Sequence, residues 1–499
     1  MCLAIPGEIV EIDGDRARAE FWDVQKWVSL DIVGDSVTEG DYILNHAGFA
    51  IRKLPEEQVE QTLEIYESFL EGDETTRWRR SARRRLTSVS TTGPRTVGPR
   101  PASVRRDRWG PTPVRPGATT PDRTPTTAPG AVVRMGDTLQ FRDPEKATRL
   151  REKIAAQMDD IGRDIRVMHV CGSHEQAIAK FGLRSILPDG LSVVMGPGCP
   201  VCVTSMPAVD EAVHLAEQGH VIATYGDMFR VPGTEQSLAD AEADGADVRT
   251  VYSASEAAEL AAECDEEVVF FATGFETTAA PTASVVLDDP PPNFSVLSAH
   301  KYVPPAMRVV AEQPSVEVDG FLAAGHAATI TGTELFEPMA EEYDLPIVVG
   351  GFEPLDVLVG LSRLLDAVAD GEPRLENAYP RAVSQSGNEA AQAALWEVFE
   401  RESGEWRGIA HVPDANLVLR PAYAEYDARE RFDIDPAVGS GDPLTEECVC
   451  GEIMSGEAQP DECDLFGEEC TPTDPVGACM VSSEGTCRIW HEYGGVPDL

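Results

Sequence analysis

The sequence predicts an α/β main body of two parallel-sheet lobes, preceded by a small N-terminal β-barrel and followed by a C-terminal cysteine-rich domain. Three observations support this fold class. The first part of the chain alternates apolar and polar residues in short runs, the centre repeats a strand–loop–helix pattern, and six of the eleven cysteines lie in the last stretch. A length of 499 residues suits two to four domains.

Residues 1–75 are expected to form the barrel, with one helix at its C-terminal end. Its strand-like runs have a period of two and are separated by Gly and Asp, which is typical of short strands joined by turns. These runs cover residues 8–12, 17–21, 26–31 and 41–44. Apolar residues then recur with a helical period from Pro55 to Leu70.

Residues 76–134 are expected to be a disordered linker, because they are rich in Arg, Pro and Thr and show no hydrophobic period. Fourteen arginines and two aspartates between Arg77 and Arg134 give this segment a net charge of +12. Three interpretations stay open: a flexible linker that docks on the acidic remainder, a basic RNA-binding arm, or the product of a shifted reading frame. As a flexible chain it spans about 40 Å.

Residues 135–440 are expected to form the two-lobed body, and residues 441–499 the cysteine-rich domain. Alternating strands and helices predict parallel sheets covered on both faces. The expected helices include 149–160, 208–218 and 255–264. The expected strands are 165–170, 191–195, 220–224, 267–272, 294–299, 320–324 and 346–349.

Charge and hydropathy restrict the possible partners and location. A formal net charge of −45 argues against nucleic-acid binding, because phosphates would be repelled. The acidity resembles adaptation to high salt, where charges are strongly screened, and otherwise indicates an acidic surface with no specific partner. No apolar run approaches the roughly 20 residues of a membrane span, and no secretory signal is evident. We therefore expect a cytoplasmic protein, in which clustered cysteines favour metal or redox chemistry.

Polar, glycine-rich corners follow most of the expected strands, at the sheet edge where α/β proteins bind ligands. One of them is Cys171-Gly-Ser-His174-Glu175. A thiolate and an imidazole three residues apart suit iron or zinc, and a helix N-terminus is expected to lower the pKa of the thiol. The alternative is a buried cysteine beside a capping serine.

Two further cysteine groups indicate redox chemistry. Cys199 and Cys202 form a Cys-x-x-Cys pair in a Gly/Pro-rich turn, which favours a redox dithiol over a zinc site. The tail has six cysteines; four can hold one iron–sulfur cluster and two remain as a dithiol, with a structural zinc knuckle as the alternative. Cys264, within an expected helix, is expected to be a bystander.

The chain opens with Met1-Cys-Leu-Ala-Ile-Pro-Gly and later contains His46-Ala-Gly-Phe-Ala50. These two elements resemble those of HypC, a small chaperone of [NiFe]-hydrogenase maturation. The resemblance implies that Cys2, exposed once Met1 is removed, is an iron ligand and that His46 lies near the same iron.

Five further elements lie in the remainder of the chain from about residue 135, at 171–175, 196–202, 274–278, 463–472 and 480–487. Together they resemble HypD, the partner of HypC. The resemblance implies assembly of an Fe(CN)2CO unit, with Cys171 and His174 on the other side of the iron from Cys2. A fusion of two interacting factors raises their effective concentration to roughly millimolar.

The HypD resemblance also implies how the tail cysteines are used. Four are expected to ligate a [4Fe–4S] cluster: Cys448, Cys463, Cys470 and Cys487. Cys450 and Cys479 then form a dithiol that relays electrons to Cys199 and Cys202, as in ferredoxin:thioredoxin reductase.

The implied partners are HypE, with HypF upstream as a source of ligands, and the hydrogenase large subunit that receives the iron unit. The implied HypC–HypD contact is intramolecular. Two other functions remain as alternatives. One is an iron–sulfur disulfide oxidoreductase acting on protein substrates, which needs neither Cys2 nor His46, and the other is a zinc-bound structural adaptor.

Overall fold

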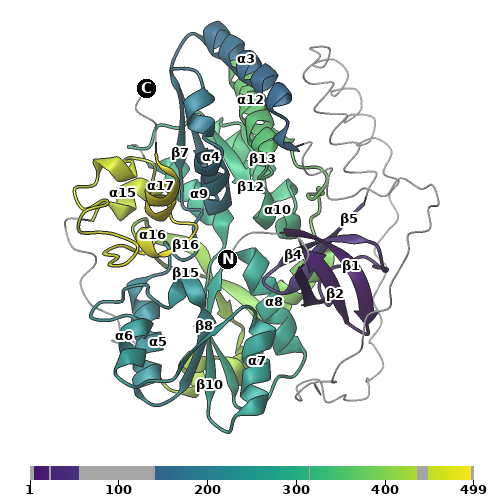
Figure 1. Ribbon diagram of the computed structural model, residues 1–499, viewed down its shortest axis with the longest axis vertical. Helices are drawn as coiled ribbons and strands as arrows, with labels where there is room; N and C mark the ends of the chain where they lie inside the picture. Colours follow the sequence, from purple (N-terminus) through teal and green to yellow (C-terminus); the bar gives the residue numbers. More distant parts are fainter. Residues whose placement is uncertain (1–4, 22–23, 56–140, 314, 435–447, 496–499) are drawn as a thin grey trace, which may run out of the picture.

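The computed structural model describes residues 5–21, 24–55, 141–313, 315–434 and 448–495. It confirms the predicted fold class: a closed barrel, an α/β body with two parallel sheets, and a cysteine-rich segment (Figure 1). The barrel and the cysteine-rich segment lie on opposite sides of the body in this view. Cys2, the helix predicted after Pro55 and the linker 76–134 lie outside the described residues.

Five strands close the barrel in the order β1-β2-β3-β5-β4. They are β1 (Ile5–Asp13), β2 (Arg16–Phe21), β3 (Val24–Ser29), β4 (Tyr42–His46) and β5 (Phe49–Leu54). Strand β2 alternates half-buried and buried residues, as its period of two predicts. Strand β5 was not predicted, because Phe49, Ala50 and Ile51 are all buried and the alternation disappears. Ala50 packs in the barrel core, while Phe49 and Ile51 join the core of the body.

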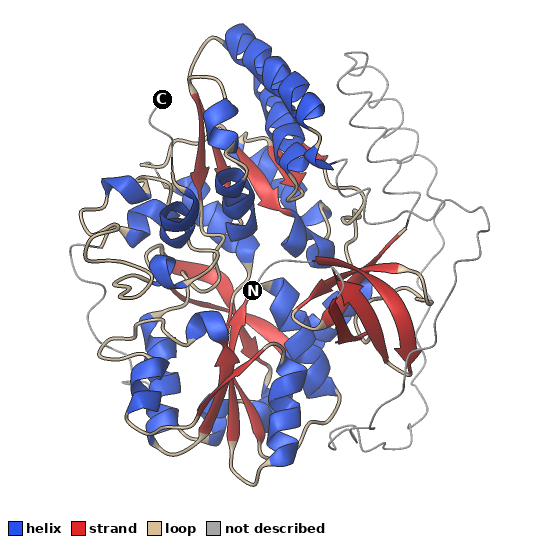
Figure 2. Cartoon of the chain, viewed as in Figure 1, coloured by secondary structure: helices blue, strands red, loops and turns tan. Residues whose placement is uncertain are grey.

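The five-stranded sheet of the body is parallel throughout, in the order β14-β13-β12-β6-β7. Its strands are β6 (Ile165–His169), β7 (Leu191–Met195), β12 (Gly320–Ala324), β13 (Ile347–Gly350) and β14 (Leu375–Asn377). Helices cover both faces of the sheet (Figure 2). The inner strands are apolar along their length because they are buried on both sides.

The four-stranded sheet is also parallel, in the order β11-β10-β8-β9. Its strands are β8 (Val221–Tyr225), β9 (Val248–Val251), β10 (Val268–Gly274) and β11 (Phe294–His300). An antiparallel hairpin of β15 (Phe399–Trp406) and β16 (Ala410–Leu419) packs beside β11. The chain begins the five-stranded sheet, builds the four-stranded one, and then returns to finish the first.

Helices pack around both sheets and in the cysteine-rich segment. Those of the five-stranded lobe include α3 (Pro144–Ile161), α4 (Gly172–Lys180), α10 (Gly325–Thr331), α11 (Glu337–Tyr343) and α12 (Pro354–Asp370). Those associated with the four-stranded lobe include α5 (Met206–Glu217), α6 (Leu238–Ala243), α7 (Ala254–Glu263), α8 (Glu276–Leu287), α9 (Val303–Glu312), α13 (Glu389–Val398) and α14 (Ala428–Arg431). The cysteine-rich segment has α15 (Cys450–Met454), α16 (Ala478–Val481) and α17 (Thr486–Tyr493).

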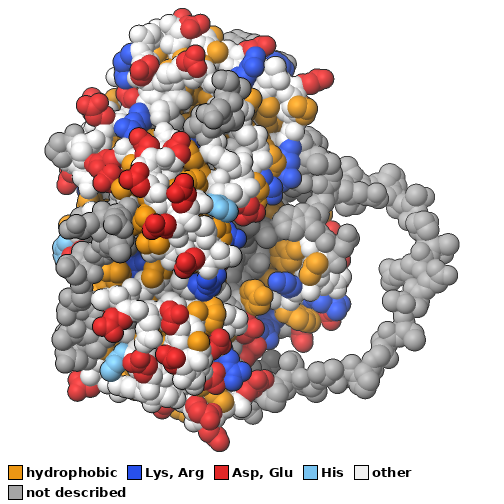
Figure 3. Space-filling view, turned by 60° about the vertical axis from the view of Figure 1, so that its left-hand side comes forward, with side chains coloured by type: hydrophobic (Ala, Val, Ile, Leu, Met, Phe, Trp, Pro, Cys, Tyr) orange, Lys and Arg blue, Asp and Glu red, His pale blue; other side chains and the backbone are white. Residues whose placement is uncertain are grey.

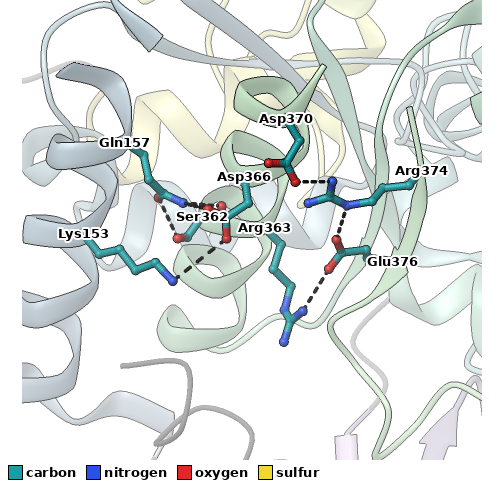
Figure 4. A network of polar contacts seen from close by, with 8 residues as sticks. All are labelled: Lys153, Gln157, Ser362, Arg363, Asp366, Asp370, Arg374 and Glu376. Carbon is teal, nitrogen blue, oxygen red and sulfur yellow. Dashed lines mark hydrogen bonds and ion pairs between the residues drawn. The ribbon is translucent and has the colours of Figure 1, made fainter. Parts of the chain in front are cut away.

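Helix α3 is fixed on α12 by a polar network as well as by apolar packing (Figure 4). Gln157 donates to Asp366 at 2.6 Å and to the carbonyl of Ser362 at 2.9 Å, and the Ser362 hydroxyl donates back to Gln157. The buried residues of α3 are Leu150, Ile154 and Met158, spaced four apart as one helix face requires.

Acidic side chains are spread over the face of the molecule shown in Figure 3 and do not gather in one patch. This distribution fits a generally acidic surface better than one dedicated binding face. Among the residues that the structure describes, no helix is long and apolar enough to cross a membrane.

Asn388 of the body holds the barrel in place. Its Nδ2 donates to the carbonyls of Ile32 at 2.6 Å and Ile51 at 2.8 Å, and its Oδ1 caps α13 by accepting from the Ala391 N–H. The Arg16–Glu259 ion pair also bridges barrel and body, but both partners are about 40% exposed and such pairs contribute little. Asn388 is therefore the main polar anchor that we identify between the two parts.

We expect Asn388→Asp to loosen the barrel while retaining the helix cap, because the carboxylate keeps an acceptor but loses both N–H donors. Two buried carbonyls left without a partner should cost about 2–4 kcal/mol of unfolding free energy. Hydrogen exchange should accelerate in the barrel strands. Asn293→Ala is the matched control: Asn293 donates to three carbonyls within the four-stranded lobe, so its loss should destabilise that lobe and leave barrel exchange unchanged.

Candidate metal centre and thiol pairs

Cys171 lies between the end of β6 and the start of α4, as the N-cap residue of that helix. The predicted position of this motif, between a strand and a helix, is confirmed, since only two residues separate β6 from α4. Gly198 is required here because a Cβ at that position would lie 2.1 Å from the backbone nitrogen of Cys171. The turn that carries Cys199 therefore packs directly against the loop that carries Cys171.

The expectation of a lowered pKa for Cys171 is wrong. The thiol is almost fully buried, and this burial raises its pKa to about 12, with the charge of Glu484 acting in the same direction. Hydrogen bonds from the start of α4 lower the pKa only in part. Because a metal binds the thiolate, metal binding at Cys171 would release a proton.

His174 is a neutral imidazole with one nitrogen available. Its Nε2 lies 3.0 Å from the carbonyl oxygen of Gly351, which can only accept, so Nε2 carries the proton. Nδ1 is then without a proton, and among the described residues it has no hydrogen-bond partner. Burial, with His169 nearby, lowers the pKa of His174 to about 3. The ring also stacks on Phe352, with ring centroids 4.6 Å apart.

The barrel brings His46 to the same region. Its side chain is fully buried, and burial lowers its pKa to about 3. Neither ring nitrogen makes a hydrogen bond to any side chain or backbone group that meets normal geometry in the described part of the chain. The backbone of Thr277, at the start of α8, lies close to the ring. A buried imidazole with two unsatisfied nitrogens is uncommon in a purely structural role.

His326 lies at one of the predicted glycine-rich corners but was not predicted as a site residue. It is the second residue of α10, just after β12, and its ring lies 6.3 Å from that of His46 and 3.7 Å from that of Phe352. Phe352 thus contacts the rings of both His174 and His326. The available signal was the Gly325-His326 corner at the carboxyl end of a strand. The site therefore combines groups from the barrel and from three corners of the five-stranded sheet.

These residues gather around one region but do not form a closed site by themselves. Within the described ranges, no three side chains of His, Cys, Asp or Glu lie close enough together to hold one metal ion. Cys2, the fourth predicted ligand, is outside those ranges. His46, Cys171 and His174 are thus placed as described above, while the predicted ligand set stays a prediction.

The Cys-x-x-Cys pair is a buried disulfide. Cys199 and Cys202 are bonded to each other, with their Cα atoms 5.3 Å apart, and neither is exposed. The turn follows β7 at the same sheet edge as Cys171. This placement brings a two-electron redox group next to the candidate metal centre.

All six tail cysteines line one small cavity. Apolar side chains complete its wall: Ile453, Leu465, Phe466 and Met480. Six soft sulfur donors in an apolar pocket fit the chemistry of an iron–sulfur cluster. The sulfurs of Cys450 and Cys479 lie 3.0 Å apart, and Cys450 also contacts the side chain of Cys448. This short approach fits the predicted dithiol, although the division of the six cysteines is still a prediction.

Arg407 connects the two thiol pairs. Its backbone N–H donates to the carbonyl of Val203 at 3.0 Å, one residue after Cys202. Its guanidinium is buried near Cys450 and Cys479; burial lowers its pKa to about 10, and negative charge on those thiols acts in the opposite direction. Its Nε and Nη1 atoms have no hydrogen-bond partner within the described residues. A buried cation therefore faces the thiol pair that is predicted to carry electrons.

Glu276, in the Gly274–Thr278 turn, is fully buried at the start of α8. One carboxylate oxygen accepts from the Val303 N–H at 3.0 Å, and burial raises its pKa to about 7. The folded protein therefore binds more protons than the unfolded chain between about pH 4.5 and 7. Unfolding free energy must fall as pH rises through this window.

We expect Glu276→Gln to remove this pH dependence. Protonation of Glu276 contributes about 3 kcal/mol to the unfolding free energy at low pH, and this contribution is lost by about pH 7. The variant should therefore be more stable than the parent at pH 8. Urea unfolding at pH 5 and pH 8 measures the effect. The exposed Glu263→Gln on α7 is the control and should leave the pH profile unchanged. An unaltered profile in Glu276→Gln would show that another group is responsible.

Comparison with known proteins agrees with this architecture. The HypD family model, described as the hydrogenase formation hypA family, matches residues 145–494, and the HupF/HypC family model matches residues 1–66. A hydrogenase expression/formation protein of Methanocaldococcus jannaschii is 44% identical over 70% of this chain and 96% of its own length. The HupD protein of Azotobacter chroococcum is 42% identical over 71% of this chain and 96% of its own length. HypD of Cupriavidus necator is 41% identical over 72% of this chain and 97% of its own length.

The two family matches fall on the two parts that the structure separates: the barrel and the body with its cysteine-rich segment. The predicted resemblance to HypC and HypD is thereby confirmed. The chain belongs to the HypD family of hydrogenase maturation factors, fused at its N-terminus to a HupF/HypC module.

Proposed function

We propose that this fusion protein is the scaffold on which the Fe(CN)2CO unit of a [NiFe]-hydrogenase is assembled and from which it is delivered. The iron unit is the cargo. Cys2 and Cys171 would supply two thiolates, with His174 and His46 beside them. Thiolates are soft, electron-rich ligands and suit an iron that also carries cyanide and CO.

The observation that carries the proposal is the position of His46. A histidine of the HypC-like barrel is buried against the HypD-like body, next to His326 and without a hydrogen bond from either ring nitrogen in the described part of the chain. A structural histidine would normally have a partner. A site completed by cargo explains why the ring nitrogens of His46 have no such partner among the described residues.

The connectivity of β1 supports a role for Cys2. This strand begins at Ile5, which pairs with Asn45, the residue before His46. Three residues of chain reach about 10 Å at most, so a ligand at position 2 of the sequence would be within reach of the region of His46. The open Nδ1 of His174 is the atom that we assign to iron, because Gly351 already accepts the proton on Nε2.

We further propose that electrons reach the site through thiol chemistry. A [4Fe–4S] cluster on Cys448, Cys463, Cys470 and Cys487 would supply one-electron redox chemistry when bound. The Cys450–Cys479 dithiol would reduce the Cys199–Cys202 disulfide by exchange: a thiolate attacks one sulfur, the second thiolate resolves the mixed disulfide, and two electrons are transferred. Arg407, between the pairs, would stabilise the attacking thiolate.

The proposal includes partners and location. HypE, loaded by HypF with ligands derived from carbamoyl phosphate, would donate to the iron, and the hydrogenase large subunit would accept the finished unit. Assembly would take place in the cytoplasm. The fused arrangement keeps the HypC and HypD parts together through these exchanges.

Infrared spectroscopy tests the scaffold. Protein purified without oxygen from cells that express the complete maturation set should show bands of iron-bound cyanide and CO. His46→Ala should lose or shift these bands while the visible absorbance of the cluster is retained. A wild-type preparation with the cluster but without such bands would contradict the scaffold function.

That same result would favour a second function, an iron–sulfur disulfide oxidoreductase acting on protein substrates. The observation in its favour is the buried Cys199–Cys202 disulfide near a second thiol pair. Such an enzyme needs no iron site at His46. Reductase activity that is unchanged in His46→Ala but lost in Cys199→Ser would support it.

A further inference from the structure

The carboxylate of Glu175 collects four hydrogen-bond contacts in the protein interior. Arg184 donates to both oxygens, at 2.9 and 2.7 Å, and Trp490 donates its indole N–H at 2.7 Å. His169 Nε2 lies 2.7 Å from Oε2. Glu175 and His169 are fully buried, and Trp490 is 4% exposed. None of these contacts was predicted from the sequence.

This network fixes the orientation of His169. Arg184 and Trp490 together donate to both oxygens of the Glu175 carboxylate, which therefore acts as the acceptor in this network. His169 Nε2, 2.7 Å from Oε2, is then the donor in that contact. The His169 ring then meets the His174 ring edge-on, with centroids 6.1 Å apart and an interplanar angle of 80°.

His174 is enclosed by three groups, and one of them, His169, belongs to this network. Phe352 stacks on one face of its ring, Gly351 accepts from its Nε2, and His169 meets it edge-on. Glu175 is the next residue on the same helix α4. A change in the Glu175 network must therefore be transmitted to the position of the His174 ring.

Trp490 comes from a different part of the chain. It lies on α17, three residues after Cys487, and α17 packs against α4. The same short helix therefore carries a cysteine of the tail cavity and the donor that holds Glu175. This is a direct structural connection between the cysteine-rich segment and the helix of Cys171 and His174.

We propose that Trp490 is a positioning residue for His174, acting through Glu175 and His169, and that it couples the cysteine-rich segment to the metal centre. The metal-binding consequence rests on the proposed scaffold function; the effect on the His174 ring does not. Hydrogen-bond partners behind a metal ligand typically change metal affinity 10- to 100-fold when they are removed.

Trp490→Phe separates this role from packing. The indole, which Arg184 overlies at 5.3 Å, is replaced by a smaller aromatic ring that lacks the N–H donor. Tyr493→Phe is the matched control, because it removes a polar hydrogen from an exposed aromatic residue on the same helix. Glu175→Gln keeps a similar side-chain volume and disrupts the same hydrogen-bond network, so it serves as a second variant if Trp490→Phe folds poorly.

The first measurement is long-range ¹H–¹⁵N NMR of the full-length protein, labelled at histidine and prepared without added Fe(II). Ring-nitrogen shifts of His169 and His174 should change in Trp490→Phe and in Glu175→Gln, and should match the parent in Tyr493→Phe. Unchanged His174 shifts in folded Trp490→Phe or Glu175→Gln would overturn the proposal. This result does not depend on whether the protein binds iron.

The second measurement is anaerobic titration with Fe(II) alone. Trp490→Phe should bind about 10-fold more weakly than the parent, with unchanged cluster absorbance. Equal affinity in the two proteins would overturn the coupling to the metal centre. A parent protein that binds no iron would instead reject the scaffold function, and the NMR result would still decide the positioning role.

Discussion

Replacing Cys171 by Ser is expected to abolish iron-bound cyanide and CO bands and to reduce hydrogenase maturation by about 100-fold or more. Removal of a direct ligand should lower metal affinity at least as much as removal of the groups that hydrogen-bond to that ligand. A serine hydroxyl is a hard ligand that stays protonated at neutral pH, so it cannot replace a soft thiolate. Infrared spectra and hydrogenase activity in a strain carrying only the variant measure the two effects.

The fold should survive this substitution, which makes the result interpretable. Cys171 is the N-cap of α4 without a side-chain capping bond, and serine is among the preferred residues at that position. Unfolding free energy should change by no more than about 1 kcal/mol. The tail cavity is formed by other cysteines, so the cluster absorbance should also remain.

Cys264→Ser is the matched control. Cys264 is the half-buried C-cap of α7 and lines neither the tail cavity nor the region of His174. The control should mature hydrogenase like the parent. Normal maturation by Cys171→Ser would refute the central site, and equal loss in both variants would indicate a general effect of removing a thiol.

Elements with a clear pattern in their own short stretch of sequence were predicted, and elements without such a pattern were missed. Strands β7 and β12 have the predicted bounds because each is a short apolar run between glycines or turn residues. Strand β9 was missed because it lies at a sheet edge and its two central residues are exposed. The β15–β16 hairpin was missed because β15 is polar between its two terminal aromatic residues, Phe399 and Trp406. Edge strands and exposed hairpins lack the apolar run on which prediction depends.

The same reasoning applies to the candidate site. Cys171, His174 and His46 could be proposed because rare residues occur in recognisable motifs. The Gly325-His326 corner was a weaker signal for His326, and Trp490 could not be proposed, since its role comes from contacts between segments distant in the sequence. The pKa of Cys171 was predicted with the wrong sign because a helix N-terminus is visible in the sequence, whereas the degree of burial is not.

Among the tail cysteines, Cys487→Ser is expected to remove the visible absorbance of the cluster, whereas Cys450→Ser should retain it. Cys487 is a predicted cluster ligand on α17, and burial raises the pKa of its thiol well above the usual value, so only metal binding would stabilise its thiolate. Cys450 lies 3.0 Å from Cys479, as expected for a dithiol outside the cluster. Iron and sulfide analysis of anaerobically reconstituted protein measures the difference.

The variants should also differ in stability and in electron transfer. Loss of the cluster should destabilise the cysteine-rich segment by several kcal/mol, because binding energy of such a group is folding energy for the residues that hold it. Cys450→Ser should keep that stability but fail to reduce the Cys199–Cys202 disulfide, which thiol alkylation followed by mass spectrometry detects. Loss of absorbance in Cys450→Ser would reassign the ligands. Zinc in place of iron and sulfide in the parent protein would support the structural adaptor instead.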